Sequence, residues 1–216
     1  MSKLGILPAA GVGSRWGGAC KELLPIGVNR WLIDSALDHL LNVGVTRICI
    51  VTSERKISTH VLHFSKSKYD NLEIFFVIQR RQQDLWGAIQ ESFPYTEAEN
   101  YMLMPDTLFK TNKLQLTDPL TLGMFTTDHP EKFGVLYNGS IVDKSPTLIG
   151  THSAWGTISW NEDMVKYWKS VKPNSFPEAL SLGLSVFPST TYSIESYEDI
   201  ASWNDYVRLF TDGVTA

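Results

Sequence analysis

Small residues and two cations follow the first apolar segment of the chain in a pattern suited to binding phosphate. Arg15 and Lys21 can neutralise phosphate charge, and small side chains before Arg15 let backbone N–H groups approach phosphate oxygens. These small residues are Pro8, Ala9, Ala10, Gly11, Gly13 and Ser14. Leu23, Leu24 and Pro25 then close the segment. The pattern predicts a loop that holds the phosphates of a nucleoside triphosphate.

Two known glycine motifs and a plain turn are alternative interpretations of this loop. A dinucleotide-binding loop requires G-x-G-x-x-G, and Trp16 stands where the third glycine should be. A Walker loop requires lysine after its second glycine; Gly13 and Gly18 have that spacing, but Ala19 replaces the lysine. An ordinary strand-to-helix turn accounts for the glycines but not for Arg15 and Lys21. A phosphate loop with its own arginine and lysine explains more of the segment.

Strand and helix patterns alternate through the first half of the chain. Strands are expected over 4–10, 47–52, 72–78 and 101–104, and helices over 31–43, 53–66 and 86–92. This alternation is typical of a mainly parallel sheet with helices on both faces, where ligands bind beyond the carboxyl ends of the strands. The phosphate loop, Gln79 and Asp106 each follow such a strand, so one shared site is expected.

The second half of the chain has shorter strands. They are expected over 121–127, 134–137, 140–142 and 154–160, with helices over 161–171, capped by Asn161, and 196–210. Neither a repeat nor a low-complexity linker divides the sequence. The predicted fold is therefore α/β: a Rossmann-like, mixed and mainly parallel sheet flanked by helices, with a small β-rich portion, in one domain over 1–216.

Composition limits the classes of partner. The chain has 216 residues, 43% of them hydrophobic, and a formal net charge of −4, which disfavours general binding to nucleic acid or to an anionic membrane. Cys20 and Cys49 do not make a disulfide framework or a zinc site. No window approaches the ~18 apolar residues of a membrane span. A cytoplasmic location is expected, and a homo-oligomer is compatible with the sequence, which does not fix the oligomeric state.

Several segments, in the right order, resemble the sugar-1-phosphate nucleotidyltransferases, a family with a GT-A-like fold. Residues 8–15 resemble its L-A-G-G-x-G-T-R signature, and residues 21–26 its P-K-x-L-L-P-I. Further likenesses are residues 104–109 to G-D-x-L-F, 129–135 to d-P-x-x-F-G-V, 141–144 to v-x-E-K-P, and 194–199 to D-I-G-T-P-E-D. Each likeness is weak alone, and their order makes the set specific.

The resemblance implies a reaction and a role for each matching residue. A sugar 1-phosphate would attack the α-phosphorus of the triphosphate in line, giving a nucleoside diphosphate sugar and pyrophosphate. Arg15 would stabilise the β- and γ-phosphates, Lys21 would bridge the two substrates, and Asp106 would hold Mg²⁺. Gln79 and Gly87 would contact the base, within a nucleotide-binding half over about 1–118. The sugar-phosphate half, about 119–216, would bind through Gly134, Asp143, Lys144 and Gly156.

Three departures from the family pattern leave alternatives open. Ser193 stands where the family has a second metal-binding aspartate, with Glu195 as a substitute ligand two residues on. Pro105 replaces the glycine before the metal aspartate. The short gap from Arg15 to Lys21 is nearer that of cytidylyltransferases acting on isoprenoid or sugar-alcohol phosphates. The alternatives are such a cytidylyltransferase, or a nucleotide-sugar-binding regulatory module that has lost turnover; the base and the sugar stay open.

Overall fold

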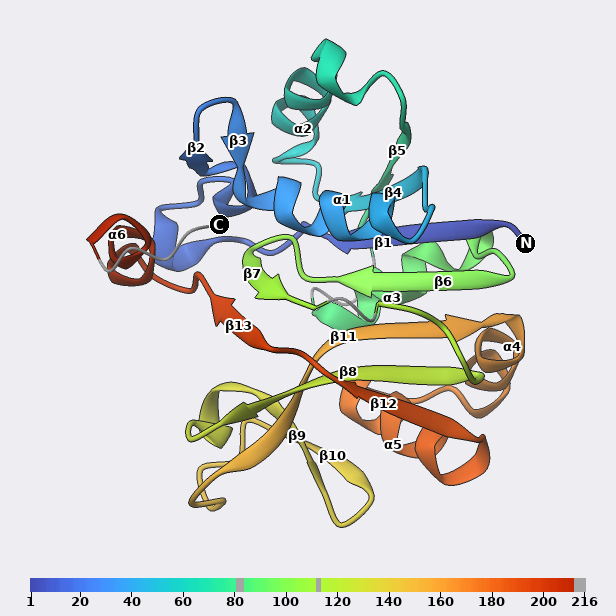
Figure 1. Ribbon diagram of the computed structural model, residues 1–216. Coiled ribbons are helices and arrows are strands. Elements are labelled where there is room, and N and C mark those ends of the chain that lie inside the picture. Colours follow the sequence, from blue (N-terminus) through green and yellow to red (C-terminus); the bar gives the residue numbers. More distant parts are fainter. Residues whose placement is uncertain (81–83, 112–113, 212–216) are drawn as a thin grey trace.

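A nine-stranded mixed sheet runs through the whole molecule between two layers of helices (Figure 1). The structure is a computed structural model that describes residues 1–80, 84–111 and 114–211. The strands follow the order β10-β9-β11-β6-β1-β4-β5; off this path, β8 pairs with β11, and β12 pairs with β8. The predicted fold class, a mixed and mainly parallel sheet flanked by helices, is confirmed.

The first half of the chain builds the parallel part of the sheet. It comprises β1 (Lys3–Pro8), β4 (Arg47–Thr52), β5 (Glu73–Ile78) and β6 (Glu99–Leu103), and each neighbouring pair is parallel. The connecting helices are α1 (Leu32–Asn42), α2 (Ile57–Phe64) and α3 (Leu85–Ser92). Because all four strands run the same way, the loops after β1, β4, β5 and β6 meet at one edge.

The second half adds antiparallel strands to β6. The long strand β11 (His152–Asn161) pairs with β6, with β8 (Leu120–Thr127) and with β9 (Gly134–Tyr137), which forms a hairpin with β10 (Ser140–Asp143). Helices α4 (Glu162–Val171) and α5 (Phe176–Val186) lead to β12 (Ser189–Ser193), which is parallel to β8. The Asn161 side chain accepts the backbone N–H groups of Asp163 and Met164, so the predicted cap is confirmed.

Two small ribbons and a terminal helix complete the fold beside the carboxyl edge. The ribbons are β2 (Pro25–Gly27) with β3 (Arg30–Trp31), and β7 (Thr107–Lys110) with β13 (Ser196–Asp199). Short 3-10 turns are η1 (Ser14–Trp16), η2 (Lys21–Leu23), η3 (Ser67–Tyr69), η4 (Phe93–Tyr95) and η5 (Pro130–Lys132). The last helix, α6 (Trp203–Thr211), lies beside the loop after β1 at one end of the molecule (Figure 1).

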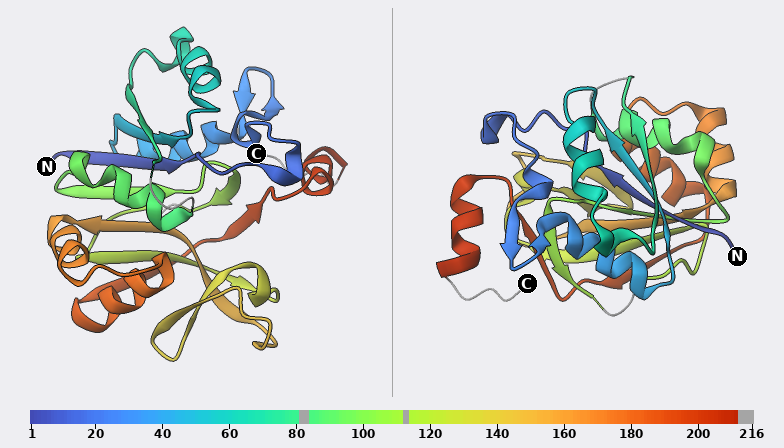
Figure 2. Two further views of the ribbon diagram at one scale, coloured as in Figure 1. Left: turned by 180° about the vertical axis from the view of Figure 1, so that it is seen from behind. Right: turned by 90° about the horizontal axis from the view of Figure 1, so that it is seen from above.

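Alternate strand residues pack into two separate cores, one on each face of the sheet. Leu4, Ile6, Cys49 and Val51 pack with α3, α4 and α5, whereas Leu7, Ile48 and Ile50 pack with α1 on the other face. The further views show α3, α4 and α5 together on one side of the sheet (Figure 2). Burial on both faces explains why these strands are continuously apolar. Of the described helices, none has the length and apolar character of a membrane span.

One predicted helix is wrong over its first residues. Residues 196–210 carry apolar side chains at helical spacing, yet Ser196–Asp199 form β13, and the helix begins only at Trp203. The strand forms because it pairs in register with β7, placing Asp199 opposite Thr107. This tertiary pairing, which overrides the local pattern, brings a carboxylate to the end of β6. Helix α5 and the strands β2, β3, β7, β12 and β13 were not anticipated from the sequence.

Candidate active site

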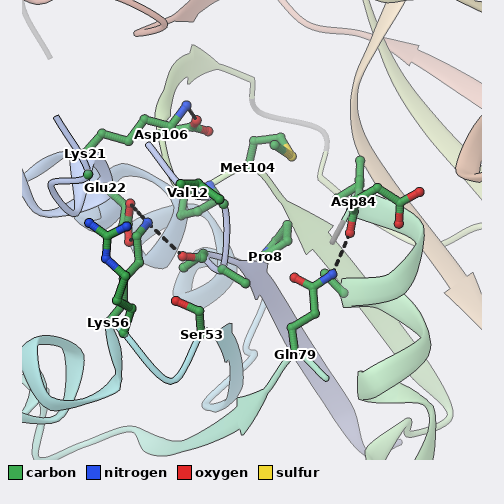
Figure 3. A pocket seen from close by; sticks show the side chains of 18 of the residues that line it. Pro8, Val12, Lys21, Glu22, Ser53, Lys56, Gln79, Asp84, Met104 and Asp106 are labelled. Atoms are coloured by element: carbon green, nitrogen blue, oxygen red, sulfur yellow. Dashed lines mark hydrogen bonds and ion pairs between the residues drawn. The ribbon is translucent and has the colours of Figure 1, made fainter. Parts of the chain in front are cut away.

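A cavity of about 620 Å³ opens at the carboxyl edge of the parallel strands. It is lined by the loops that follow β1, β4, β5 and β6 and by the first turn of α3 (Figure 3). A second cavity, of about 530 Å³, adjoins it and shares Asp84, Leu85 and Met104 with the first. Both volumes suit a ligand of nucleotide or sugar-phosphate size. The edge can therefore hold two small molecules side by side.

The loop after β1 is tightly folded back on itself. Gly13 has a φ of +62°, and its carbonyl accepts the N–H groups of Trp16 and Gly18 at 2.8 and 3.0 Å. A Cβ at Gly13 would lie 2.7 Å from the Ala19 carbonyl oxygen, so this position requires glycine. Pro8, Ala9, Ala10 and Gly11 line the first cavity, whereas Gly13, Ser14 and Arg15 are not among its lining residues.

Aromatic residues of α6 hold the outer part of this loop. The Trp16 ring packs edge-on against Trp203 and Tyr206, with ring centroids 5.8 and 6.1 Å apart. The Tyr206 hydroxyl also donates to the Pro25 carbonyl. The C-terminal helix thus anchors both ends of the segment between Arg15 and Pro25. No signal in the local sequence of this loop pointed to that support.

Lys21 and Asp106 form an ion pair between the loop and the end of β6 (Figure 3). Burial disfavours the charged ammonium, but the carboxylate of Asp106 more than offsets this effect, and the pKa of Lys21 is raised. Both side chains line the first cavity. A partly buried positive charge, held in place by Asp106, is therefore available beside the point where the two cavities meet.

Asp106 retains an oxygen suited to a metal ion. The residue is only 5% exposed, and its Oδ1 atom is buried without a hydrogen-bond partner among the described residues. Asp199 lies close by, because it pairs with Thr107 and the Ile200 N–H donates to the Asp106 carbonyl at 3.2 Å. Burial and then the negative charge of Asp106 raise the pKa of Asp199 to about 6. Two crowded carboxylates with an unpartnered oxygen fit a hard divalent cation such as Mg²⁺.

The structure does not bring Glu195 to this cluster. Its side chain is half exposed and pairs with Lys110 at 3.3 Å, at the far end of the β7–β13 ribbon from Asp106. Glu195 lies just before β13 and opposite the end of β7, whereas Asp199 is the last residue of β13 and lies opposite Thr107. The carboxylate that the fold places beside Asp106 is Asp199, which the sequence analysis did not select. The metal set supported by this geometry is Asp106 with Asp199.

A buried charged network underlies the phosphate loop. Glu22, 2% exposed, accepts hydrogen bonds from Lys56 at 3.1 and 3.3 Å and lies 2.7 Å from His60 Nε2. Burial opposes the charge of Glu22, but these two partners prevail and its pKa is lowered. Lys56 also donates to the Ala9 carbonyl at 3.1 Å. Although Cys20, Glu22 and His60 lie within metal-ligand reach of one another, the Lys56 ammonium supplies the positive charge there.

Breaking this network is expected to destabilise the protein. Lys56→Met should lower the free energy of unfolding by roughly 3–5 kcal/mol at pH 7, because it leaves the Glu22 carboxylate buried without its main cation. Urea unfolding followed by circular dichroism measures the effect. Adding Glu22→Gln to Lys56→Met should restore part of the loss, because the uncompensated charge is then removed. A single variant as stable as the wild type would contradict the role given to this pair.

The other end of the first cavity offers groups for a nucleobase. Gln79 lines it and donates from Nε2 to the Asp84 carbonyl at 2.8 Å (Figure 3). Asp84 caps α3 by accepting the Gly87 N–H at 2.8 Å. Gly87 itself is buried beneath the surface, and Ala88 lines the cavity instead. Gln79 thus lines the cavity, and its contact with a base stays a prediction, whereas Gly87 supports the helix start.

The second cavity contains most of the residues predicted for the sugar phosphate. Gly134, Asp143 and Lys144 line it. Gly156 does not, because it packs against Tyr197: a Cβ there would lie 2.6 Å from the Tyr197 ring. Besides Asp84, Leu85 and Met104, residues that the sequence analysis did not select complete the lining: Trp86, Thr107, Lys132, Phe133, Trp155, Ser175, Phe176, Pro177, Tyr197 and Asp199. Lys132 and Lys144 can bind a phosphate, and Asp143 can accept hydrogen bonds from hydroxyl groups, so this lining suits a phosphorylated polyol.

Comparison with known proteins gives matches by structure only. Neither a family model nor a curated protein matches the sequence. A protein described as a glucose-1-phosphate thymidylyltransferase from Bacillus anthracis superposes with a TM-score of 0.83 at 18% identity, covering 100% of this chain and 96% of that one. UDP-glucose pyrophosphorylase from Acinetobacter baumannii gives 0.76 at 18%, covering 97% and 92%. The chain has the fold of the sugar-1-phosphate nucleotidyltransferases.

A further match of the same fold covers nearly the whole length of both chains. HddC from Yersinia pseudotuberculosis gives a TM-score of 0.73 at 20% identity, covering 99% of this chain and all of that one. At such identities the likeness establishes the fold, and the roles of individual residues rest on the geometry of this chain.

Proposed function

We propose that the protein is a nucleotidyltransferase that joins a nucleoside triphosphate and a sugar 1-phosphate, releasing pyrophosphate. The observation that carries the proposal is the cluster of Lys21, Asp106 and Asp199 where the two ligand-sized cavities adjoin. Both substrates are anionic, so transfer between them depends on positioning and on neutralising charge. The cluster offers both at the point where the reacting phosphates would meet.

Each group in the cluster has a role that follows from its place. Lys21, held by the Asp106 carboxylate, would contact the α-phosphate and the attacking phosphate. Lys132 and Lys144, in the second cavity, would bind the acceptor phosphate, and Asp143 would accept hydrogen bonds from sugar hydroxyls. Asp106 and Asp199 would hold Mg²⁺, which when bound neutralises charge on the triphosphate oxygens. No protein nucleophile is needed for an in-line attack.

Arg15 remains assigned to the triphosphate, but at a distance from the cavity wall. Its side chain is exposed, and its charge acts on Asp199 by lowering the pKa of that carboxyl against the larger opposing effects. The guanidinium therefore lies within electrostatic range of the acidic cluster. We expect the loop to bring Arg15 onto the β- and γ-phosphates when a nucleotide is bound.

The structure removes the reason for considering a regulatory module that has lost turnover. It rested on Ser193 in place of the second metal aspartate, and Asp199 supplies a carboxylate beside Asp106 in this fold. The cytidylyltransferase alternative rests on the short segment from Arg15 to Lys21. The choice of triphosphate tests it directly, because exclusive use of CTP with a non-hexose phosphate would support it.

A substrate panel tests the proposed reaction. Purified protein with Mg²⁺ should release pyrophosphate from at least one pairing of ATP, CTP, GTP, UTP or dTTP with a panel of sugar 1-phosphates and sugar-alcohol phosphates. Chromatography should show the matching nucleoside diphosphate sugar in equal amount. If the folded protein neither binds a triphosphate nor turns over any pair, the proposed function is wrong.

A further inference from the structure

We infer that Arg55 binds the outer phosphates of the triphosphate, as a second arginine beside the phosphate loop. The inference rests on the proposed function and deepens it. Arg55 follows β4, in a turn that the sequence motifs did not select. It lines the first cavity, whereas Arg15 is not among the lining residues. The guanidinium in the cavity wall therefore comes from the turn after β4, whereas the resemblance assigned this role to Arg15 in the loop after β1.

The guanidinium lies directly against the backbone of the phosphate loop. A Cβ built on Gly18 would collide with Nη2 of Arg55, so the absence of a side chain at residue 18 makes room for this contact. Gly18 also has a φ of +85°, which side chains rarely tolerate. The loop geometry and the approach of Arg55 thus depend on the same glycine.

The turn that carries Arg55 is fixed at its base. The N–H groups of Lys56 and Ile57 both donate to the Ser53 carbonyl at 3.0 Å, which closes a tight helical turn. The Lys56 ammonium then binds the Ala9 carbonyl at the start of the phosphate loop and the Glu22 carboxylate beyond its end. Arg55 is therefore presented to the cavity by a buried anchor that spans the loop.

Charge pairing distinguishes Arg55 from the other cations of this cavity. Lys21 is paired with Asp106 and Lys56 with Glu22. For Arg55, no carboxylate of residues 1–80, 84–111 or 114–211 lies within ion-pair distance, although Glu54 of the same turn also lines the cavity. Arg55 is exposed, and within the part of the chain that the structure describes its guanidinium donates to no carboxylate, so the planar group suits bidentate binding of phosphate.

The position of the turn indicates which phosphates Arg55 would reach. Lys56 and Glu22 lie on the opposite side of the opening from Gln79 and Asp84 (Figure 3). A nucleotide with its base at Gln79 therefore directs its phosphate chain toward the turn, where Arg55 lies against Gly18 in the cavity wall. The groups that fit there are the β- and γ-phosphates, which a nucleoside monophosphate lacks.

Isothermal titration calorimetry with Mg²⁺ and no acceptor tests this inference. The probes are the five triphosphates of the substrate panel and the monophosphate of whichever binds most tightly. Arg55→Ala is expected to weaken triphosphate binding roughly 10–100-fold, the range for one or two charge-assisted hydrogen bonds, and to leave monophosphate binding unchanged. Arg55→Lys should recover part of the loss, because lysine keeps the positive charge but lacks the paired N–H donors of the guanidinium.

Lys166→Ala is the matched control, since it removes the same charge from an exposed position on α4. It should bind both probes as the wild type does. Triphosphate affinity unchanged in Arg55→Ala would overturn the inference while leaving the proposed function intact. Equal losses for the triphosphate and the monophosphate would also overturn it, because they would place Arg55 at the base or the α-phosphate. Failure of the wild type to bind any triphosphate would refute the proposed function and this inference together.

Discussion

Asp106→Asn is expected to lower turnover by roughly 10²–10³-fold or more while the protein remains folded. The substitution keeps the shape of the side chain and removes the negative charge that would hold the cation and that pairs with Lys21. Both effects fall on the transferring phosphate, where charge neutralisation supplies most of the catalysis. Pyrophosphate release at saturating substrates measures the loss, and a thermal melt checks the fold.

Glu195→Gln is the matched control for Asp106→Asn. It also converts a carboxylate to an amide, at the residue that the sequence alone assigned to the metal. Because Glu195 is half exposed and paired with Lys110, near-wild-type turnover is expected. A loss in Glu195→Gln as large as that in Asp106→Asn would mean that the acidic pair was wrongly chosen. Full activity in Asp106→Asn would contradict the role of Asp106 itself.

The part of the site that the sequence could predict is the part built on parallel strands. Buried strands read as continuous apolar runs, and the residues that follow them must share one edge. This reasoning placed Gly11, Gln79 and Asp106 in a single site, and the structure brings all three to one cavity. Short-range patterns were sufficient because each residue is positioned by the strand immediately before it.

The residues that the sequence did not reveal are positioned by contacts distant in the chain. Asp199 reaches Asp106 only because β13 pairs with β7. In the sequence this strand is hidden, because Tyr197 and Ile200 have the spacing of one face of a helix. Arg55 reaches Gly18 only because Lys56 is anchored on Ala9 and Glu22. Neither the approach of Asp199 to Asp106 nor that of Arg55 to Gly18 produces a periodic pattern of apolar residues, so neither contact can be recognised from the local sequence. Alternation within the four residues of β13 was too short to outweigh the helical pattern.

Asp199→Asn is expected to stabilise the metal-free protein above pH 6 while it lowers turnover. Burial and the charge of Asp106 raise the pKa of Asp199 to about 6 in the folded state, against an ordinary value of 3.8. Between these values the folded protein binds more protons than the unfolded chain, so the wild type loses stability as the pH rises from about 4 to about 6. The asparagine variant lacks this loss.

The gain in stability from Asp199→Asn should be roughly 1–2 kcal/mol at pH 7.5 and should vanish near pH 4. The full pKa shift would correspond to about 3 kcal/mol, and partial exposure of the side chain reduces it. Thermal melts in a chelating buffer at both pH values measure the difference. Added Mg²⁺ should raise the melting temperature of the wild type more than that of the variant, because the cation binds the folded state through both carboxylates. A variant that is less stable at pH 7.5, or that gains equally from Mg²⁺, would show that Asp199 is not the repelled partner of Asp106.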